Sequence, residues 1–81
     1  MSEKTYYVVQ PFEKKGRRLT AAPATQCRSD DEAIARAERD AKRYVGVVAF
    51  RQVADDETGE TADEPVFLAR HGELPSEMSD E

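Results

Sequence analysis

Two side chains in the sequence have the chemistry of a nucleophile, a general base or a metal ligand, namely Cys27 and His71. A cysteine nucleophile needs a histidine beside it in space, and no glycine elbow surrounds Cys27. A structural zinc site normally takes about four cysteine or histidine ligands, whereas this chain has one of each. We therefore predict a half-buried Cys27, a His71 that ends a strand, and a non-enzymatic protein without cofactor or metal.

The acidic segment 55–64 contains oxygen ligands of the kind that calcium prefers. An EF-hand loop has glycine at its sixth position and a bidentate glutamate at its twelfth. With Gly59 as that glycine, the first and twelfth positions fall on Ala54 and Pro65, whose side chains have no oxygen ligands. The glycines are also isolated from one another, which excludes a glycine-rich phosphate loop. We predict a solvated connection between two strands.

Basic side chains form the largest remaining set. The hairpin cluster consists of Lys14, Lys15, Arg17 and Arg18, and the helix cluster of Arg36, Arg39, Lys42 and Arg43. Lysine and arginine bind phosphates with a salt-dependent, sequence-independent affinity, and Tyr6 and Tyr7 could stack on bases at an open sheet face. Charged residues at an exposed turn also oppose aggregation. Both a polyanion-binding surface and a merely solvated surface fit these residues.

The charge is unevenly distributed along the 81 residues, whose net charge is −5. Residues 1–52 carry eleven basic and seven acidic side chains, a net charge of +4. Residues 53–81 carry Arg70 against ten acidic side chains, a net charge of −9. Such asymmetry fits a nucleic-acid-binding half with an acidic tail, or a solvated surface with a disordered end.

The elements that must position these side chains begin with a β-hairpin. Aromatic and β-branched residues predict a first strand over 4–12. Pro11 has no N–H to donate, so we expect this strand to be an edge there or to end. A turn around Gly16 leads to a weaker second strand over 19–25, which Pro23 interrupts.

A helix follows the hairpin. Ser29 and Glu32 have the spacing of a capping box, in which each side chain accepts from the other residue's N–H, and they predict a helix over about 30–44. One apolar stripe recurs at helical spacing. It consists of Ile34, Ala37, Ala41 and Tyr44.

Two further strands complete the predicted domain. The apolar run 47–53 predicts a central strand, and 66–70 predicts the last strand. We expect the helix stripe to pack on one face of these strands. The residues expected there are Val48, Phe50 and Phe67.

The order β-β-α-β-β predicts an α+β fold, a mostly antiparallel four-stranded sheet with one helix packed on one face. We expect a single domain over 1–72 and a disordered acidic tail over 73–81. The first and last strands should be sheet edges. No apolar run approaches the ~20 residues that cross a bilayer, and the N-terminus lacks the features of a signal peptide. We therefore expect a cytoplasmic protein without membrane contact.

Three segments carry a resemblance to known sequences. They are YYVVQPF at 6–12, SDDEA at 29–33 and GVVAF at 46–50. With these segments the chain resembles short alphaproteobacterial proteins of unknown function. The resemblance covers most of 5–75, and it implies no activity, cofactor or site residue.

These observations predict a small non-enzymatic protein-interaction module, a homodimer or an accessory subunit, because a small core would leave sheet edges and a second sheet face open. The alternative is a nucleic-acid-binding accessory protein that uses the hairpin cluster and the helix cluster. The tail 73–81 could fold over the basic surface and compete with an anionic partner. A formed catalytic pocket has little room in 81 residues.

Overall fold

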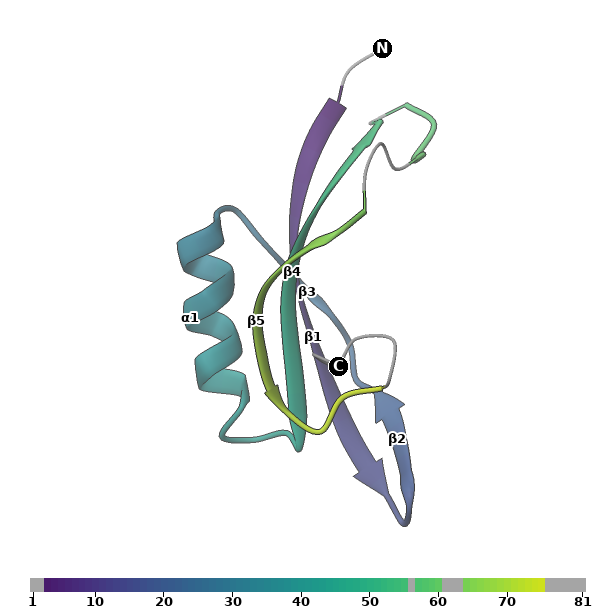
Figure 1. Cartoon of the computed structure of the whole chain (residues 1–81), viewed down its shortest axis with the longest axis vertical. Coiled ribbons are helices and arrows are strands. Elements are labelled where there is room, and N and C mark those ends of the chain that lie inside the picture. Colours follow the sequence, from purple (N-terminus) through teal and green to yellow (C-terminus); the bar gives the residue numbers. More distant parts are fainter. Residues whose placement is uncertain (1–2, 56, 61–63, 76–81) are drawn as a thin grey trace.

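The computed structural model describes residues 3–55, 57–60 and 64–75, which form one antiparallel sheet and one helix (Figure 1). The strand order is β2-β1-β4-β5, and β3 pairs with β1 beside β2. The α+β prediction is confirmed, but the sheet has five strands instead of four. The elements are β1 (Glu3–Lys15), β2 (Arg18–Ala21), β3 (Thr25–Cys27), α1 (Asp30–Asp40), β4 (Gly46–Asp55) and β5 (Val66–Gly72).

The predicted hairpin is formed by β1 and β2. Lys15 pairs with Arg18 across the two-residue connection. Gly16 in this connection has φ +64°, a conformation that side chains disfavour and glycine adopts freely. The hairpin cluster therefore lies at an exposed two-residue turn that the sequence specifies locally.

The predicted second strand is divided into β2 and β3, and both pair with the same edge of β1. The Pro11 carbonyl accepts from Ala22 N–H at 3.0 Å, and the Gln10 amide donates to the Pro11 and Ala22 carbonyls. In an antiparallel strand the N and O atoms of one residue point to the same side. The N–H that Pro11 lacks would therefore point toward residues 22–24, which connect β2 to β3 and include Pro23.

The prediction that the first strand is a sheet edge is wrong. Strand β1 lies inside the sheet, with β4 on one side and β2 and β3 on the other. Pro11 is tolerated there because the Gln10 side-chain amide donates to the Ala22 carbonyl at 2.6 Å, the acceptor that lies opposite the Pro11 nitrogen. The last strand, β5, is an edge as expected, since among the described residues it pairs with β4 alone.

Helix α1 begins at the predicted cap. The Ser29 hydroxyl accepts from Glu32 N–H at 3.1 Å, but the Glu32 carboxylate accepts from Arg28 N–H at 2.8 Å instead of from Ser29. The helix ends at Asp40, four residues before the predicted end. Lys42 N–H and Arg43 N–H donate to carbonyls three residues back, so the chain tightens into a turn that leads into β4.

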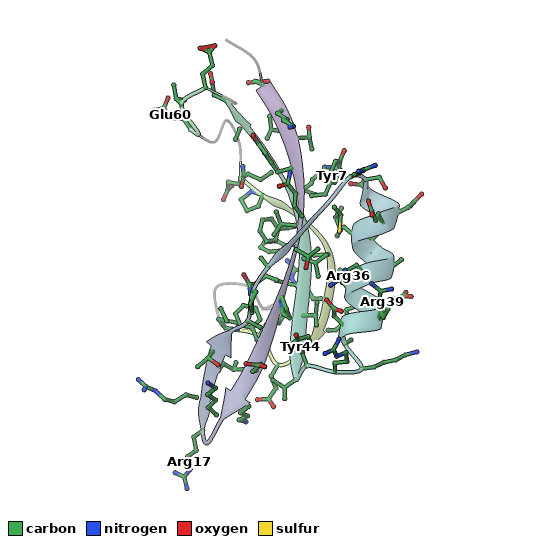
Figure 2. The ribbon with its side chains drawn as sticks, turned by 180° about the vertical axis from the view of Figure 1, so that it is seen from behind. Tyr7, Arg17, Arg36, Arg39, Tyr44 and Glu60 are labelled. Carbon is green, nitrogen blue, oxygen red and sulfur yellow. The ribbon has the colours of Figure 1, made fainter. Side chains whose placement is uncertain are left out.

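The core lies between α1 and the sheet face that carries Val9, Val47 and Ala49. Ala33 and Ala37 are fully buried against this face, and their small side chains let the helix lie close to the strands. Ala37, Ala41 and Tyr44 pack as predicted, while the half-buried Ile34 lies beside the buried row. Tyr7 and Tyr44 lie between sheet and helix near its two ends (Figure 2).

The predicted sheet partners of the helix are wrong. Side chains alternate between the two faces of a strand, so Val48 and Phe50 point away from the face of Val47 and Ala49. Phe67 pairs with Phe50 on that second face. The helix packs on Val9, Val47 and Ala49, whereas Val48 is fully buried on the other face.

The described residues continue beyond β5 as far as Pro75. Glu73 N–H donates to the Val45 carbonyl at 2.9 Å, and its carboxylate lies 3.0 Å from Lys14 Nζ. Residues 76–81 of the predicted tail lie outside the described residues. The molecule measures 44 × 23 × 22 Å, with the β1–β2 turn at one end of its long axis and the β4–β5 connection at the other (Figure 1).

Candidate binding groove between β3 and α1

The two predicted basic clusters lie on separate parts of the molecule. Arg17 projects from the hairpin end, whereas Arg36 and Arg39 lie on the helix (Figure 2). Lys14 is paired with Glu73, and Arg36 with Asp40. The remaining two members of the helix cluster, Lys42 and Arg43, follow α1 in the turn, where Arg43 lies over the Tyr44 ring at 5.8 Å. These eight residues therefore do not form one continuous basic surface.

A groove of about 720 Å³ separates β3 from α1. This volume lies within the ~300–1,000 Å³ range of ligand sites. Strand β3 forms one side of the groove and α1 forms the other, so two members of the helix cluster line it. The lining residues are Thr25, Gln26, Cys27, Arg28, Glu32, Ala35, Arg36 and Arg39.

The floor of the groove is neutral. Cys27 is buried and pairs with Tyr7 in the ladder between β3 and β1. Burial raises the pKa of the Cys27 thiol, and the nearby Glu32 and Asp40 carboxylates add to this increase while Arg36 opposes it. The thiol thus stays protonated at neutral pH, because both burial and neighbouring negative charge disfavour the thiolate.

Cys27 and His71 are too far apart to act together. Cys27 lies in β3 and His71 in β5, and β1 and β4 lie between them. Three strand spacings of about 4.8 Å separate the two residues by about 14 Å across the sheet. A thiol and an imidazole at this separation cannot exchange a proton directly.

The outer edge of β3 carries a free backbone donor and acceptor. Because the Pro11 carbonyl faces β2, alternation directs the backbone groups of Val9 and Tyr7 toward β3 as well. Val9 and Tyr7 pair with Thr25 and Cys27, so the N–H and C=O of Gln26 point away from β1 into the groove. Within the described part of the chain, these two groups have no backbone partner.

The helix side of the groove is held by an ion pair whose carboxylate is buried. Arg36 Nε donates to both carboxylate oxygens of Asp40, at 3.2 and 3.3 Å, and the Asp40 side chain is 7% exposed. This pair fixes Arg36 along the helix surface. Ala35, one residue before it, is exposed and widens the groove next to the backbone of the helix.

The groove carries excess positive charge. Arg28 and Arg39 are exposed, and neither side chain is ion-paired to any residue in the described ranges. The Glu32 carboxylate already accepts from Arg28 N–H, and Asp40 is used by Arg36. Two guanidinium groups therefore remain available to an anionic ligand.

The sheet face without the helix is aromatic. The rings of Phe50 and Phe67 lie edge to face with centroids 6.0 Å apart. Arg70 lies over the Phe67 ring at 4.5 Å and Lys4 over the Tyr6 ring at 5.5 Å. These half-buried rings form a second surface on which another protein could pack.

Arg28 and the edge of β3 were not among the predicted site residues. The prediction of one second strand over 19–25 hid the short strand that follows Pro23. Two signals were present in the sequence: a proline that divides the strand, and a basic residue immediately before the helix cap. Their significance depends on α1 folding back beside residues 25–28.

Neither a metal centre nor a membrane-spanning element is found in the part of the chain that the structure describes. No cluster of three or more His, Cys, Asp or Glu side chains there could hold a metal ion, and no helix is long and apolar enough to cross a bilayer. The resemblance to short alphaproteobacterial proteins stays a prediction. No protein-family model, curated protein or solved structure matches this chain.

Proposed function

We propose that this protein is a protein-interaction module that binds an extended segment of a partner protein along the outer edge of β3. The observation that carries the proposal is the unpaired N–H and C=O of Gln26, which face the groove beside α1. A free strand edge accepts a further strand through main-chain hydrogen bonds, and a neighbouring groove selects its side chains. This function needs no catalytic group.

The dimensions of the groove support a short ligand. Strand β3 has three residues, which span about 10 Å at the usual strand rise. Glu32 and Arg39 are seven residues apart on α1, which is about 10 Å along the helix axis. Both sides therefore match a bound segment of about three or four residues in extended conformation.

The free edge of β2 is less suited to this role. The helix forms a groove with β3 and not with β2. A strand added at β3 would gain side-chain contacts with α1 as well as main-chain hydrogen bonds. Side-chain contacts distinguish a specific site from an edge that pairs with any strand.

Substitution of Gln26 tests the proposal. Gln26→Pro removes the N–H that faces the groove and leaves the β1–β3 hydrogen bonds in place, because proline is tolerated where the N–H of an edge strand faces solvent. Gln26→Ala is the matched control, since it keeps the N–H and changes only the side chain. Linear peptides selected from a random phage-displayed library on the wild-type protein serve as ligands.

We expect the selected peptides to bind wild type and Gln26→Ala alike, and to bind Gln26→Pro about ten-fold more weakly, as expected from losing the one hydrogen bond that the Gln26 N–H donates. Fluorescence polarisation with synthetic peptides measures the affinities, and thermal unfolding checks that each variant is folded. A library that yields no ligand, or peptides that bind all three proteins equally, would contradict the proposal.

A homodimer is the second candidate. It is favoured by the aromatic sheet face, where Phe50 and Phe67 pack on each other without a covering helix. Burying such rings against a second copy would remove apolar surface from water. This use of the second face is compatible with a peptide at β3, because the groove opens on the helix side of the sheet.

A further inference from the structure

We infer that the segment bound at the β3–α1 groove is acidic, with carboxylate side chains at alternate positions. This inference rests on the proposed function and names the class of partner segment that the groove selects. It follows from the charge of the groove, the spacing of its arginines and the absence of a stacking surface among its lining residues.

The groove carries more positive than negative charge, which favours a carboxylate ligand. Arg39 and Arg28 lie at its surface without an ion-pair partner among the described residues. The one exposed carboxylate in the lining, that of Glu32, is held by Arg28 N–H at the start of the helix. Arginine binds carboxylates through two parallel hydrogen bonds, which are among the stronger polar contacts in proteins.

The spacing of the arginines matches the period of a strand. Arg36 and Arg39 are three residues apart on α1 and therefore share one face of the helix. In a strand added to β3, every second side chain would point toward α1, and such side chains are about 7 Å apart. Carboxylates at positions i and i+2 would thus lie beside the free guanidinium of Arg39 and beside the terminal N–H groups of Arg36, whose Nε is used by Asp40. The residue between them would point to the other side.

An acidic peptide fits these features better than a nucleic acid does. The free N–H and C=O of Gln26 pair with a peptide backbone, for which a sugar–phosphate chain has no equivalent. No aromatic side chain is among the lining residues, so bases would find no stacking platform.

The first test is the composition of the peptides selected on the wild-type protein. We expect Asp and Glu to be enriched at alternate positions, and replacement of these residues by Asn and Gln to weaken binding about ten-fold. Raising the salt concentration should weaken the acidic peptides more than their amide versions, because exposed ion pairs are screened. Selected peptides without acidic enrichment, or amide versions of equal affinity, would overturn the inference.

The second test uses two variants with the same change of charge. Arg39→Glu reverses a charge inside the groove, and Arg17→Glu reverses one at the hairpin end. We expect Arg39→Glu to weaken the acidic peptides by more than ten-fold and Arg17→Glu to leave their affinity within two-fold. Equal effects of the two variants would show a general attraction by net charge and would overturn the inference.

The outcomes separate the two proposals. Peptides that depend on the Gln26 N–H but show no acidic preference would overturn the acidic inference and leave the interaction module standing. Peptides that ignore Gln26→Pro would overturn the proposed function itself. A single-stranded DNA oligonucleotide that displaces the peptides and is weakened by Arg39→Glu would overturn the inference in favour of a nucleic-acid ligand.

Discussion

At the scale of single residues, the buried carboxylate of Asp40 determines which arginine in the groove is free to meet a ligand. Asp40 is 5% exposed, and a charge so far from water needs a partner. Arg36 supplies this partner and is thereby held against the helix. The pair leaves Arg39, one turn further along α1, as the arginine that is free to meet a ligand.

Substitution of Asp40 by Asn should lower stability and strengthen peptide binding. The amide keeps the size of the side chain but loses the charge that holds Arg36, so the free energy of unfolding should fall by about 1 kcal/mol. Arg36 would then be free to bind an acidic peptide. Urea unfolding and peptide titration measure the two effects. A variant with wild-type stability and affinity would show that the ion pair has neither role.

The Cys27 thiol should react slowly at neutral pH. Burial and the nearby carboxylates raise its pKa, so the rate of alkylation should rise with pH around a midpoint above that of the urea-unfolded chain. The folded state holds the thiol proton more tightly, so stability should fall as the pH rises from the unfolded toward the folded pKa. Equal midpoints in the folded and unfolded protein would contradict this expectation.

At the scale of elements, the alanines of α1 determine how closely the helix approaches the sheet. Ala33 and Ala37 are fully buried against Val9, Val47 and Ala49. A larger side chain in this row would push the helix away from the sheet. The groove beside β3 depends on the same distance, since its helix side is the neighbouring face of α1.

Two leucine substitutions two residues apart on α1 should separate core packing from groove shape. Ala37→Leu overfills the core and should lower the free energy of unfolding by about 1–3 kcal/mol. Ala35→Leu adds the same atoms at an exposed groove position, so it should leave stability within about 0.5 kcal/mol of wild type while reducing peptide affinity. Chemical unfolding and peptide titration measure both. Similar destabilisation by both would contradict the helix orientation described above.

At the scale of the whole molecule, opposite charges lie at opposite ends. The hairpin cluster extends from one end of the long axis (Figure 2). The other end is formed by the end of β4 at Asp55 and the following connection with Glu57 and Glu60. The net charge of −5 therefore describes neither end. Between the ends, the helix side holds the groove, and the opposite side presents the aromatic face.

The hairpin end provides the test of the nucleic-acid alternative. If that alternative holds, single-stranded DNA binds at low salt, weakens steeply as salt is added, and loses affinity when Arg17 and Arg18 are replaced by Glu. For a peptide-binding module we expect no binding of single-stranded DNA at physiological salt, because the two basic clusters lie on separate parts of the molecule. Salt-resistant binding that needs both clusters would contradict it.

The aromatic face should support self-association. Sedimentation of the wild-type protein at micromolar concentrations should detect a dimer that dissociates on dilution. Val8→Glu adds a charge to this face and should shift the protein to the monomer, whereas Arg17→Glu should not. A 9.1 kDa species at every concentration would contradict the homodimer and leave the β3 groove unaffected.

The sequence alone predicts the features that depend on neighbouring residues. Ser29 caps the helix because the Glu32 N–H is three residues away. Gly16 forms the hairpin turn because glycine readily adopts the positive φ that this turn requires. The apolar run before Asp55 forms a strand inside the sheet, as its composition indicates. The α+β class and the positions of the main elements follow from such local signals.

The tertiary structure decides the features that depend on distant residues. Whether β1 is an edge depends on which strands pair with it. Pro11 is tolerated inside the sheet because the Gln10 side-chain amide donates to Ala22 in place of the missing N–H. Which face of β4 meets the helix is likewise decided by packing, and Val47 and Ala49 lie on that face.

The groove between β3 and α1 depends on distant residues most clearly of all. Sequence placed Arg36 and Arg39 on an exposed helix face, but it could not place the backbone of Gln26 beside them. That proximity arises because β3 pairs with β1 while α1 packs across β1, β4 and β5. The sequence by itself thus determined the elements and their basic side chains. Only the packing of helix on sheet, through long-range contacts, decided which of them face a common ligand.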